Sequence, residues 1–174
     1  MQRTRFTAMD CPIARSLDRV GEWWSILILR DAFRGVTRFD DFSASLGVAP
    51  NILTRRLGAL TEAGLLERRQ YSERPPRYEY VLTGRGRDFR PVLLAMLDWG
   101  NRHFPPDDRT VEIVETATGR VVKPLLVDPE TGKRVDGPGY TVVHKRHDGR
   151  GARPRLSVVD GTPPDEPAVG GSRS

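Results

Sequence analysis

Apolar side chains recur at helical spacing through the first third of the chain. Ile13, Leu17 and Val20 repeat at i, i+4 and i+7, which places them on one face of a helix. Trp23 and Trp24 begin a segment dense in large apolar residues, so we assign both rings to the core rather than to a ligand cage. The pattern predicts four helices, over residues 12–20, 22–33, 38–46 and 50–63, with Gly47 and Gly64 as stops after the last two.

The segment from residue 50 to 63 has two contrasting faces. Leu53, Leu57 and Leu60 form an apolar stripe that suits burial in a core. The opposite face is compact, polar and basic. Its members are Asn51, Thr54, Arg55 and Gly58.

The pattern changes to that of two strands after residue 64. The segments LLERRQY and RYEYVLT are rich in strand-forming residues, and the intervening residues predict a hairpin tip. Pro75 and Pro76 fix φ and remove two backbone donors, so this tip is stiff and cannot extend the ladder. Arg74 and Arg77 flank the prolines. The tip is therefore either a solvated turn or a loop built to contact an anionic partner.

A fifth helix is predicted after the hairpin, with Thr83 as its N-cap. Gly84 and Gly86 weaken its first turn, so the regular part is expected to begin near Asp88. Between residues 89 and 99 apolar side chains occur on nearly all sides. A terminal helix of a small domain has only one side toward its own core, so a second chain is expected to cover the rest. The candidate dimer-interface residues are Ile13, Leu93, Leu94, Leu97 and Trp99.

Beyond residue 104, valines alternate with turn signals. The segments ATGR and DPETGK each place a glycine at a turn and predict two β-hairpins, and YTVVHKRH is compatible with one more strand. From about Asp148, glycine, proline, arginine and serine dominate, and disorder is expected. The predicted organisation is a main domain over residues 1–104, a small β-hairpin extension over 105–147 and a disordered tail over 148–174.

Charge is distributed unevenly along the chain. Residues 1–104 contain 17 arginines and 12 acidic residues, whereas residues 105–174 contain 11 basic and 11 acidic residues. The whole net charge of +5 therefore lies in the first part, where nucleic acid is the natural partner. There is no apolar run of 18 residues and no signal-like start, so we expect a cytoplasmic, nucleoid-associated protein without a membrane contact.

Candidate chemistry is sparse. One cysteine excludes an intramolecular disulfide and a cysteine-based zinc cluster within one chain. His144 and His147 lack partners at metal-ligand spacing, so neither a metal nor another cofactor is expected. No Ser/His/Asp set or phosphate-binding loop is visible, which argues against an enzyme.

The order of elements is that of a winged helix-turn-helix, an α+β fold with a two-stranded wing, followed here by the C-terminal β-hairpin extension. The helix over residues 50–63 occupies the recognition position, whose first turns contact base edges in the major groove. Arginines of the wing suit phosphates or a narrow minor groove. For Arg56, which lies near the buried stripe, a structural ion pair is an equal alternative. The candidate DNA-binding residues are Asn51, Thr54, Arg55, Arg56, Arg68, Arg69, Arg74 and Arg77.

Several separated motifs together resemble the HxlR-type winged helix-turn-helix transcriptional regulators of bacteria. They are the Cys-Pro start, the Trp of the second helix, RF, L-x-x-RL, the Pro-Pro-Arg wing and the closing Trp-Gly, all within residues of about 10–104. The resemblance implies a homodimer that binds double-stranded operator DNA, with the first and last helices forming the dimer contact. The chain departs from the pattern at Ala49, where a capping serine is usual, and at Gly58, where a longer residue is common.

Cys11 precedes Pro12 at the start of the first predicted helix, where the helix dipole favours a thiolate. Some HxlR-like regulators use a cysteine at this place to sense quinones, aldehydes or oxidants. The alternative is an inert cysteine at the dimer seam. Cys11 is therefore a candidate thiol sensor.

The leading interpretation is a homodimeric, sequence-specific transcriptional regulator, a repressor that responds to a small-molecule effector or to thiol modification. The alternative is a winged-helix protein-interaction module that binds an acidic partner. Residues 50–90 contain nine arginines and five acidic residues, placed on both the helix face and the wing, which favours DNA. The operator, its inverted repeat and the inducer are not encoded in the chain.

Overall fold

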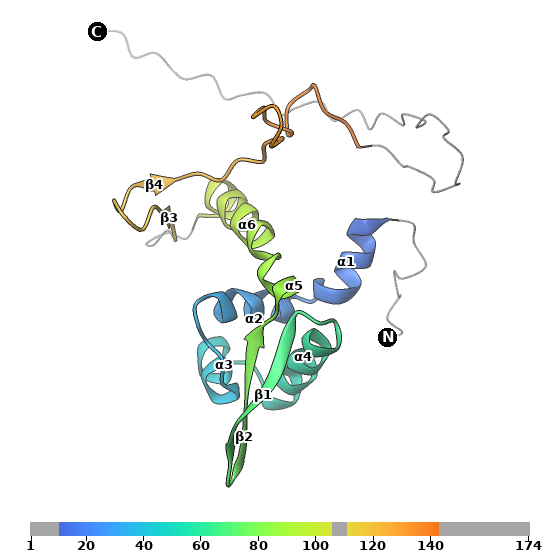
Figure 1. Cartoon of the computed structure of the whole chain (residues 1–174), viewed down its shortest axis with the longest axis vertical. Coiled ribbons are helices and arrows are strands. Elements are labelled where there is room, and N and C mark those ends of the chain that lie inside the picture. The colour runs from blue at the N-terminus through green and yellow to red at the C-terminus, as the bar shows by residue number, and fades with distance from the viewer. Residues whose placement is uncertain (1–10, 106–110, 143–174) are drawn as a thin grey trace. The chain divides into compact units, whose positions relative to one another are not determined.

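A computed structural model describes residues 11–105 and 111–142 of the 174-residue chain. The chain divides into two compact units, one ending at Pro124 and the other beginning at Leu125, and each is described by itself. The domain boundary at residue 104 stays a prediction, and the tail over 148–174 lies outside the described residues. The first unit contains α1 (Pro12–Val20), α2 (Trp23–Phe33), α3 (Phe39–Leu46), α4 (Pro50–Glu62), β1 (Leu66–Glu73), β2 (Pro76–Leu82), α5 (Gly84–Arg87), α6 (Arg90–His103), β3 (Ile113–Val114) and β4 (Val121–Val122) (Figure 1).

The core forms where α2 packs against α3 and α4. Ile28 and Phe42 are fully buried there, as is Leu57 from the apolar stripe of α4. Trp24 packs against this core, whereas Trp23 is 77% exposed in the single chain. The assignment of both rings to the core is therefore wrong for Trp23, which lies on the other side of α2.

The predicted helix ends are confirmed around the helix-turn-helix. Pro50 occupies the first turn of α4, where a missing N–H costs nothing. Gly47 ends α3 with φ 60°, and Gly64 follows α4 with φ 70°, both in the left-handed region that favours glycine. Ala49 supplies no side-chain cap to α4, as its side chain predicts.

The wing is the antiparallel hairpin of β1 and β2, which pair from Leu66 with Leu82 to Glu73 with Pro76. Both strands extend further toward the tip than predicted, so the tip consists of Arg74 and Pro75, whose peptide bond is cis. A bulge between Gln70 and Ser72 leaves Tyr71 outside the paired register. The Tyr80 N–H also donates to the Thr37 carbonyl at 2.7 Å, and the backbone of Arg38 forms an antiparallel β-bridge with that of Glu79. The segment before α3 therefore lies along the free edge of β2.

The predicted fifth helix is divided in two. Thr83 caps α5, because its hydroxyl accepts a hydrogen bond from the Gly86 N–H at 3.0 Å. Pro91 has no N–H to donate to Arg87, so the helix breaks before α6 begins at Arg90. The regular helix therefore begins two residues after Asp88, where the two glycines had placed its start.

The two turns of the predicted β-hairpin extension are present and share one hydrogen-bond pattern. The Thr118 hydroxyl donates to the Glu115 carboxylate at 2.6 Å, and the Thr131 hydroxyl donates to the Asp128 carboxylate at 2.7 Å. The paired segments are short. They are β3 with β4 in the first unit, and the single bridge of Val127 with Arg134 in the second. Most of the further strand predicted over 140–147 lies outside the described residues.

Candidate nucleic-acid interface

The exposed face of α4 carries the polar residues that the sequence selects. Asn51, Thr54 and Arg55 are exposed, while Leu53 on the opposite side is fully buried. The Asn51 Oδ1 accepts a hydrogen bond from the Ile52 N–H at 2.8 Å, so its amide nitrogen remains as a donor. Within the described chain, the Arg55 guanidinium has no carboxylate at ion-pair distance. This face can therefore present an amide, a hydroxyl and a free cation to a groove.

Arg56 does not belong to that face. It is one of the few buried charged residues, and its Nη2 lies 2.8 Å from Glu22 Oε2 at the junction of α1 and α2. Its Nε is buried without a hydrogen-bond partner among the described residues. The structure therefore contains the ion pair that was the alternative for Arg56. Arg56 lies one residue off the exposed face of α4, which argues against a DNA contact.

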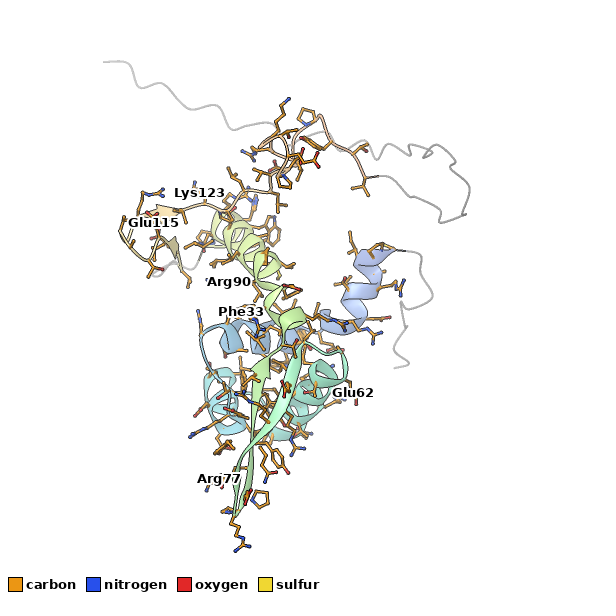
Figure 2. The ribbon with its side chains drawn as sticks, in the orientation of Figure 1. Phe33, Glu62, Arg77, Arg90, Glu115 and Lys123 are labelled. Carbon is orange, nitrogen blue, oxygen red and sulfur yellow. The ribbon has the colours of Figure 1, made fainter. Side chains whose placement is uncertain are left out.

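The arginines of the wing differ in their surroundings. Arg68 lies over the Tyr78 ring, with its guanidinium carbon 3.6 Å from the ring centroid. Arg69 is paired with Glu79 at 2.8 Å, so one carboxylate offsets its charge. Arg74 at the tip and Arg77 close to it on β2 are exposed, and Figure 2 shows Arg77 near the far end of the hairpin. The tip and Arg68 therefore keep their full charge.

Arg38 lies with these residues, whereas the sequence pattern placed it in the first turn of the third predicted helix. It precedes α3, but its backbone pairs with β2, and its guanidinium carbon is 4.8 Å from the centroid of the Tyr71 ring. The β-branched pair Val36 and Thr37 just before it is the one sequence feature that suggests an added strand.

Two arginines of α5 have structural roles instead. Arg85 donates to the Ala63 carbonyl at 3.0 Å, which holds α5 against the end of α4. Arg87 donates to the Leu82 carbonyl at 2.8 Å. The excess of arginine over residues 50–90 is thus divided between groups that support the fold and groups that face solvent.

The candidate dimer residues are also divided. Ile13 of α1 is 73% exposed and Trp99 of α6 is 52% exposed, whereas Leu94 and Leu97 are half-buried. Leu93 is also half-buried, and it packs against the protein's own core. No residue of α6 is fully buried, which agrees with the apolar character of several of its sides.

Cys11 forms the N-cap of α1 and is partly exposed. Its carbonyl accepts the first helical hydrogen bond, from the Arg15 N–H at 3.0 Å, and no side-chain cap is formed. The thiol therefore lies where the sequence places it, at the N-terminus of a short helix.

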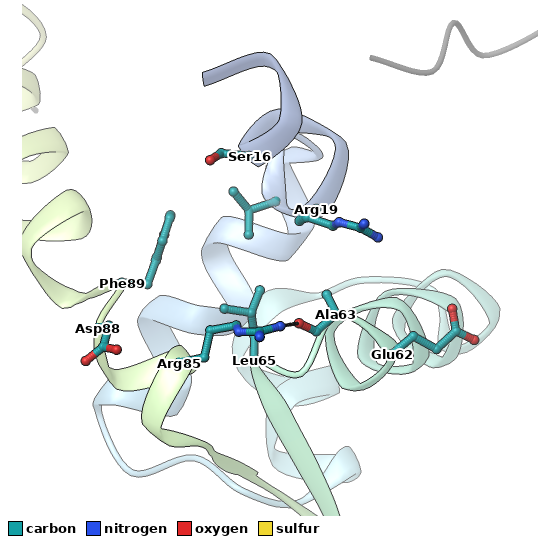
Figure 3. A pocket seen from close by; sticks show the side chains of 9 residues that line it. Ser16, Arg19, Glu62, Ala63, Leu65, Arg85, Asp88 and Phe89 are labelled. Carbon is teal, nitrogen blue, oxygen red and sulfur yellow. Dashed lines mark hydrogen bonds between the residues drawn. The ribbon is translucent and has the colours of Figure 1, made fainter. Parts of the chain in front are cut away.

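A solvent-open pocket of about 380 Å³ lies at the junction of α1, the end of α4 and the α5–α6 break. Its lining includes the apolar residues Val20, Leu65 and Phe89 and the cations Arg19 and Arg85 (Figure 3). Its volume falls within the range of small-molecule sites, roughly 300–1,000 Å³.

Residues 11–105 and 111–142 form neither a metal-ligand cluster nor a membrane-spanning helix. No three side chains of His, Cys, Asp or Glu come together as metal ligands there. None of the helices in that part combines the length and apolar character that a bilayer crossing requires.

The order of elements and the exposed basic face define a DNA-binding winged helix-turn-helix protein, a class of transcriptional regulators rather than enzymes. Residues 19–108 match the model of the HxlR-like helix-turn-helix family, so the chain belongs to that family. A relative, the uncharacterised HTH-type transcriptional regulator Mb3122 of Mycobacterium bovis, is 35% identical over 137 residues, which cover 74% of this chain and 87% of the relative.

Solved structures give the same fold. PA1607, described as a candidate transcription factor, is 39% identical with a TM-score of 0.72, over 82% of this chain and all of that one. PA1374 of Pseudomonas aeruginosa, likewise a candidate transcription factor, is 55% identical with a TM-score of 0.58, over 79% and 94%. The redox regulator HypR in its reduced form is 32% identical with a TM-score of 0.50, over 53% and 95%. The matches to PA1607 and PA1374 cover more of the chain than the family region, residues 19–108, so they include part of the extension.

Proposed function

We propose that this protein is a homodimeric, sequence-specific transcriptional repressor that binds an inverted-repeat operator in the bacterial cytoplasm. The observation that carries the proposal is the placement of Asn51, Thr54 and Arg55 on the exposed face of α4, beside a wing with Arg74 and Arg77 at its tip. A helix of this kind fits the major groove, and its first turns reach base edges. Family membership favours DNA over an acidic protein partner.

The two parts of this surface have different roles in binding. Arg55 suits a guanine edge and Asn51 an adenine edge, because each side chain can form two hydrogen bonds with that base. The tip arginines suit phosphates, which are the same at every base pair. Base contacts therefore set the sequence preference, and wing contacts contribute affinity for any duplex.

Gel shifts with DNA from upstream of the protein's own gene test this division. Arg55→Ala is expected to cost on the order of 1–3 kcal/mol at one base position of each half-site. Arg77→Ala is expected to weaken binding to every duplex and to reduce its salt dependence. If both variants bound like the parent, α4 and the wing would not be the DNA-binding surface.

The homodimer is supported by the apolar residues of α1 and α6 that the single chain leaves exposed, Ile13 and Trp99 among them. A two-fold dimer matches an operator with two half-sites about one helical turn apart. Trp99→Glu is expected to give a monomer by light scattering, because it places a charge at the contact. A parent protein that is monomeric at micromolar concentration would remove this part of the proposal.

Two features support regulation by a small molecule or by thiol modification. A ligand in the 380 Å³ pocket would touch the end of α4 and the start of α6, so it would bias the position of the recognition helix relative to the dimer helix. Cys11 lies at the end of α1, and the similar regulator HypR is a redox regulator.

Reporter assays in which the cells are exposed to quinones, aldehydes and aromatic acids separate the two routes. Cys11→Ser abolishes the response if thiol modification is the signal. Ser16→Trp, which places a large ring at the pocket, abolishes it if the pocket binds the effector. A response that survives both changes would exclude both sites.

A further inference from the structure

The backbone of Arg38 is held by the wing. Arg38 pairs with Glu79 of β2, and the neighbouring Thr37 carbonyl accepts a hydrogen bond from the Tyr80 N–H at 2.7 Å. These contacts use main-chain atoms, so they do not depend on the arginine side chain. A substitution of Arg38 can therefore change the surface of the wing without removing the edge segment.

The side chain of Arg38 extends across β2 to the ring of Tyr71 on β1. Its guanidinium carbon lies 4.8 Å from the ring centroid, a cation–π distance. The β1 bulge leaves Tyr71 outside the regular register at this point. The stack orients the guanidinium but leaves its positive charge and its N–H donors in place.

The Glu79 carboxylate forms no ion pair with Arg38, although the backbones of the two residues form a β-bridge. That carboxylate is bound to Arg69 at 2.8 Å. Within the described chain, Arg38 has no carboxylate at ion-pair distance. Glu79 is thus ion-paired with Arg69, and the arginine without an ion pair is Arg38, whose guanidinium lies over the Tyr71 ring.

We propose that Arg38 contacts the phosphodiester backbone of duplex DNA and that Tyr71 is the residue that positions it. The proposal deepens the proposed DNA-binding function and rests on it. In a helix-turn-helix, the helix before the recognition helix crosses the DNA backbone, and Arg38 is the N-cap residue of that helix, α3. Asp40 and Asp41 already occupy the first turn of α3, so the attraction for phosphate comes from the guanidinium rather than from the helix dipole.

Fluorescence anisotropy with a labelled duplex of arbitrary sequence, at several salt concentrations, tests the contact. Arg38→Gln keeps part of the stem and removes the charge. Its affinity is expected to fall severalfold. The slope of log affinity against log salt should become less steep by about 1.8, the value of two phosphates, because each protomer of the proposed dimer loses one contact. Arg102→Gln is the matched control, because Arg102 is an exposed arginine of α6 outside the wing. It should keep the parental slope.

Variants of Tyr71 test the positioning role. Tyr71→Phe keeps the ring face and should bind like the parent, whereas Tyr71→Leu should lose part of the affinity. In the Arg38→Gln background, Tyr71→Leu should cause no further loss, because the group that it positions is absent. Additive losses would overturn the positioning role.

Three outcomes separate this inference from the function on which it rests. If Arg38→Gln keeps the parental slope while Arg77→Gln lowers it, the DNA surface stands and the Arg38 contact is refuted. A lower melting temperature with an unchanged slope has the same meaning, because it assigns Arg38 a structural role only. If the parent binds no duplex at low salt, both the inference and the proposed function fail.

Discussion

Replacement of Arg56 tests whether an arginine of the recognition helix serves the fold or the DNA. Its side chain is 10% exposed, its partner Glu22 is 27% exposed, and the joining atoms are 2.8 Å apart. Removal of one partner from a buried pair costs about 3–5 kcal/mol, and the partial exposure of Glu22 lets water recover some of that cost. We expect Arg56→Met to lower the free energy of unfolding by about 2–3 kcal/mol. For a domain of this size the melting temperature falls by about 10–20 °C.

The neighbouring Arg55→Met supplies the matched control. Arg55 is exposed, so its loss should change stability by no more than about 0.5 kcal/mol. Its effect on DNA binding should be large, since it removes the base contact proposed for Arg55. Arg56→Met, measured at a temperature where it is fully folded, should bind an arbitrary duplex with the parental salt slope. Arg56→Met should therefore lower stability without changing DNA binding, and Arg55→Met should weaken DNA binding without changing stability.

Chemical denaturation of Arg56→Met, Glu22→Gln and the double variant completes the assay. The double variant should be more stable than the sum of the single losses predicts, with a coupling of about 1–2 kcal/mol. The buried Nε of Arg56 has no partner in the described part of the chain, which limits what the pair contributes. Parental stability of Arg56→Met together with a reduced salt slope would refute the reasoning and return Arg56 to the DNA surface.

The remaining predictions concern glycines and the second turn of the extension. Gly58→Ala should raise the free energy of unfolding by about 0.5–1 kcal/mol, since a Cβ there meets no atom, whereas Gly86→Ala should lower it because the Cβ would overlap the Leu65 carbonyl; calorimetry of both decides. The Thr131 hydroxyl and the Glu130 N–H lower the pKa of Asp128 below its ordinary value of 3.8. These hydrogen bonds therefore stabilise the turn at higher pH, and the stabilisation is lost as the pH falls through the lowered pKa. Thr131→Val should raise that pKa in a carboxyl NMR titration.

Local features of the sequence predicted the helix-turn-helix because its boundaries depend on adjacent residues. Gly47 and Gly64 end their helices through their own backbone freedom, and Pro50 begins α4 through its missing donor. The division of the last predicted helix required only one more local fact. Pro91 breaks the hydrogen-bond ladder, and the sequence shows it.

The roles of individual arginines could not be predicted in the same way, because they depend on partners far along the chain. Glu22 and Arg56 belong to different helices, and the helical pattern places Arg56 only near the edge of the apolar stripe. The stack of Arg38 on Tyr71 likewise requires the edge pairing with β2 and the bulge in β1. Trp23 shows a different limit. It belongs to the apolar helix α2, and its apolar character alone does not show whether its side of the helix faces the core.

The same division of roles sets the electrostatic strength of DNA binding. Glu22 offsets Arg56, Glu79 offsets Arg69, and the arginines of α5 bind backbone carbonyls, so the count of basic residues overstates the number of phosphate contacts. Four cations on or beside the wing remain for phosphates in each protomer: Arg38, Arg68, Arg74 and Arg77. At about 0.9 per phosphate, the proposed dimer, with eight such cations, should show a salt slope of about −7. A slope near −2 would mean that the wings do not touch the duplex, and one well beyond −7 would require cations outside the described surface.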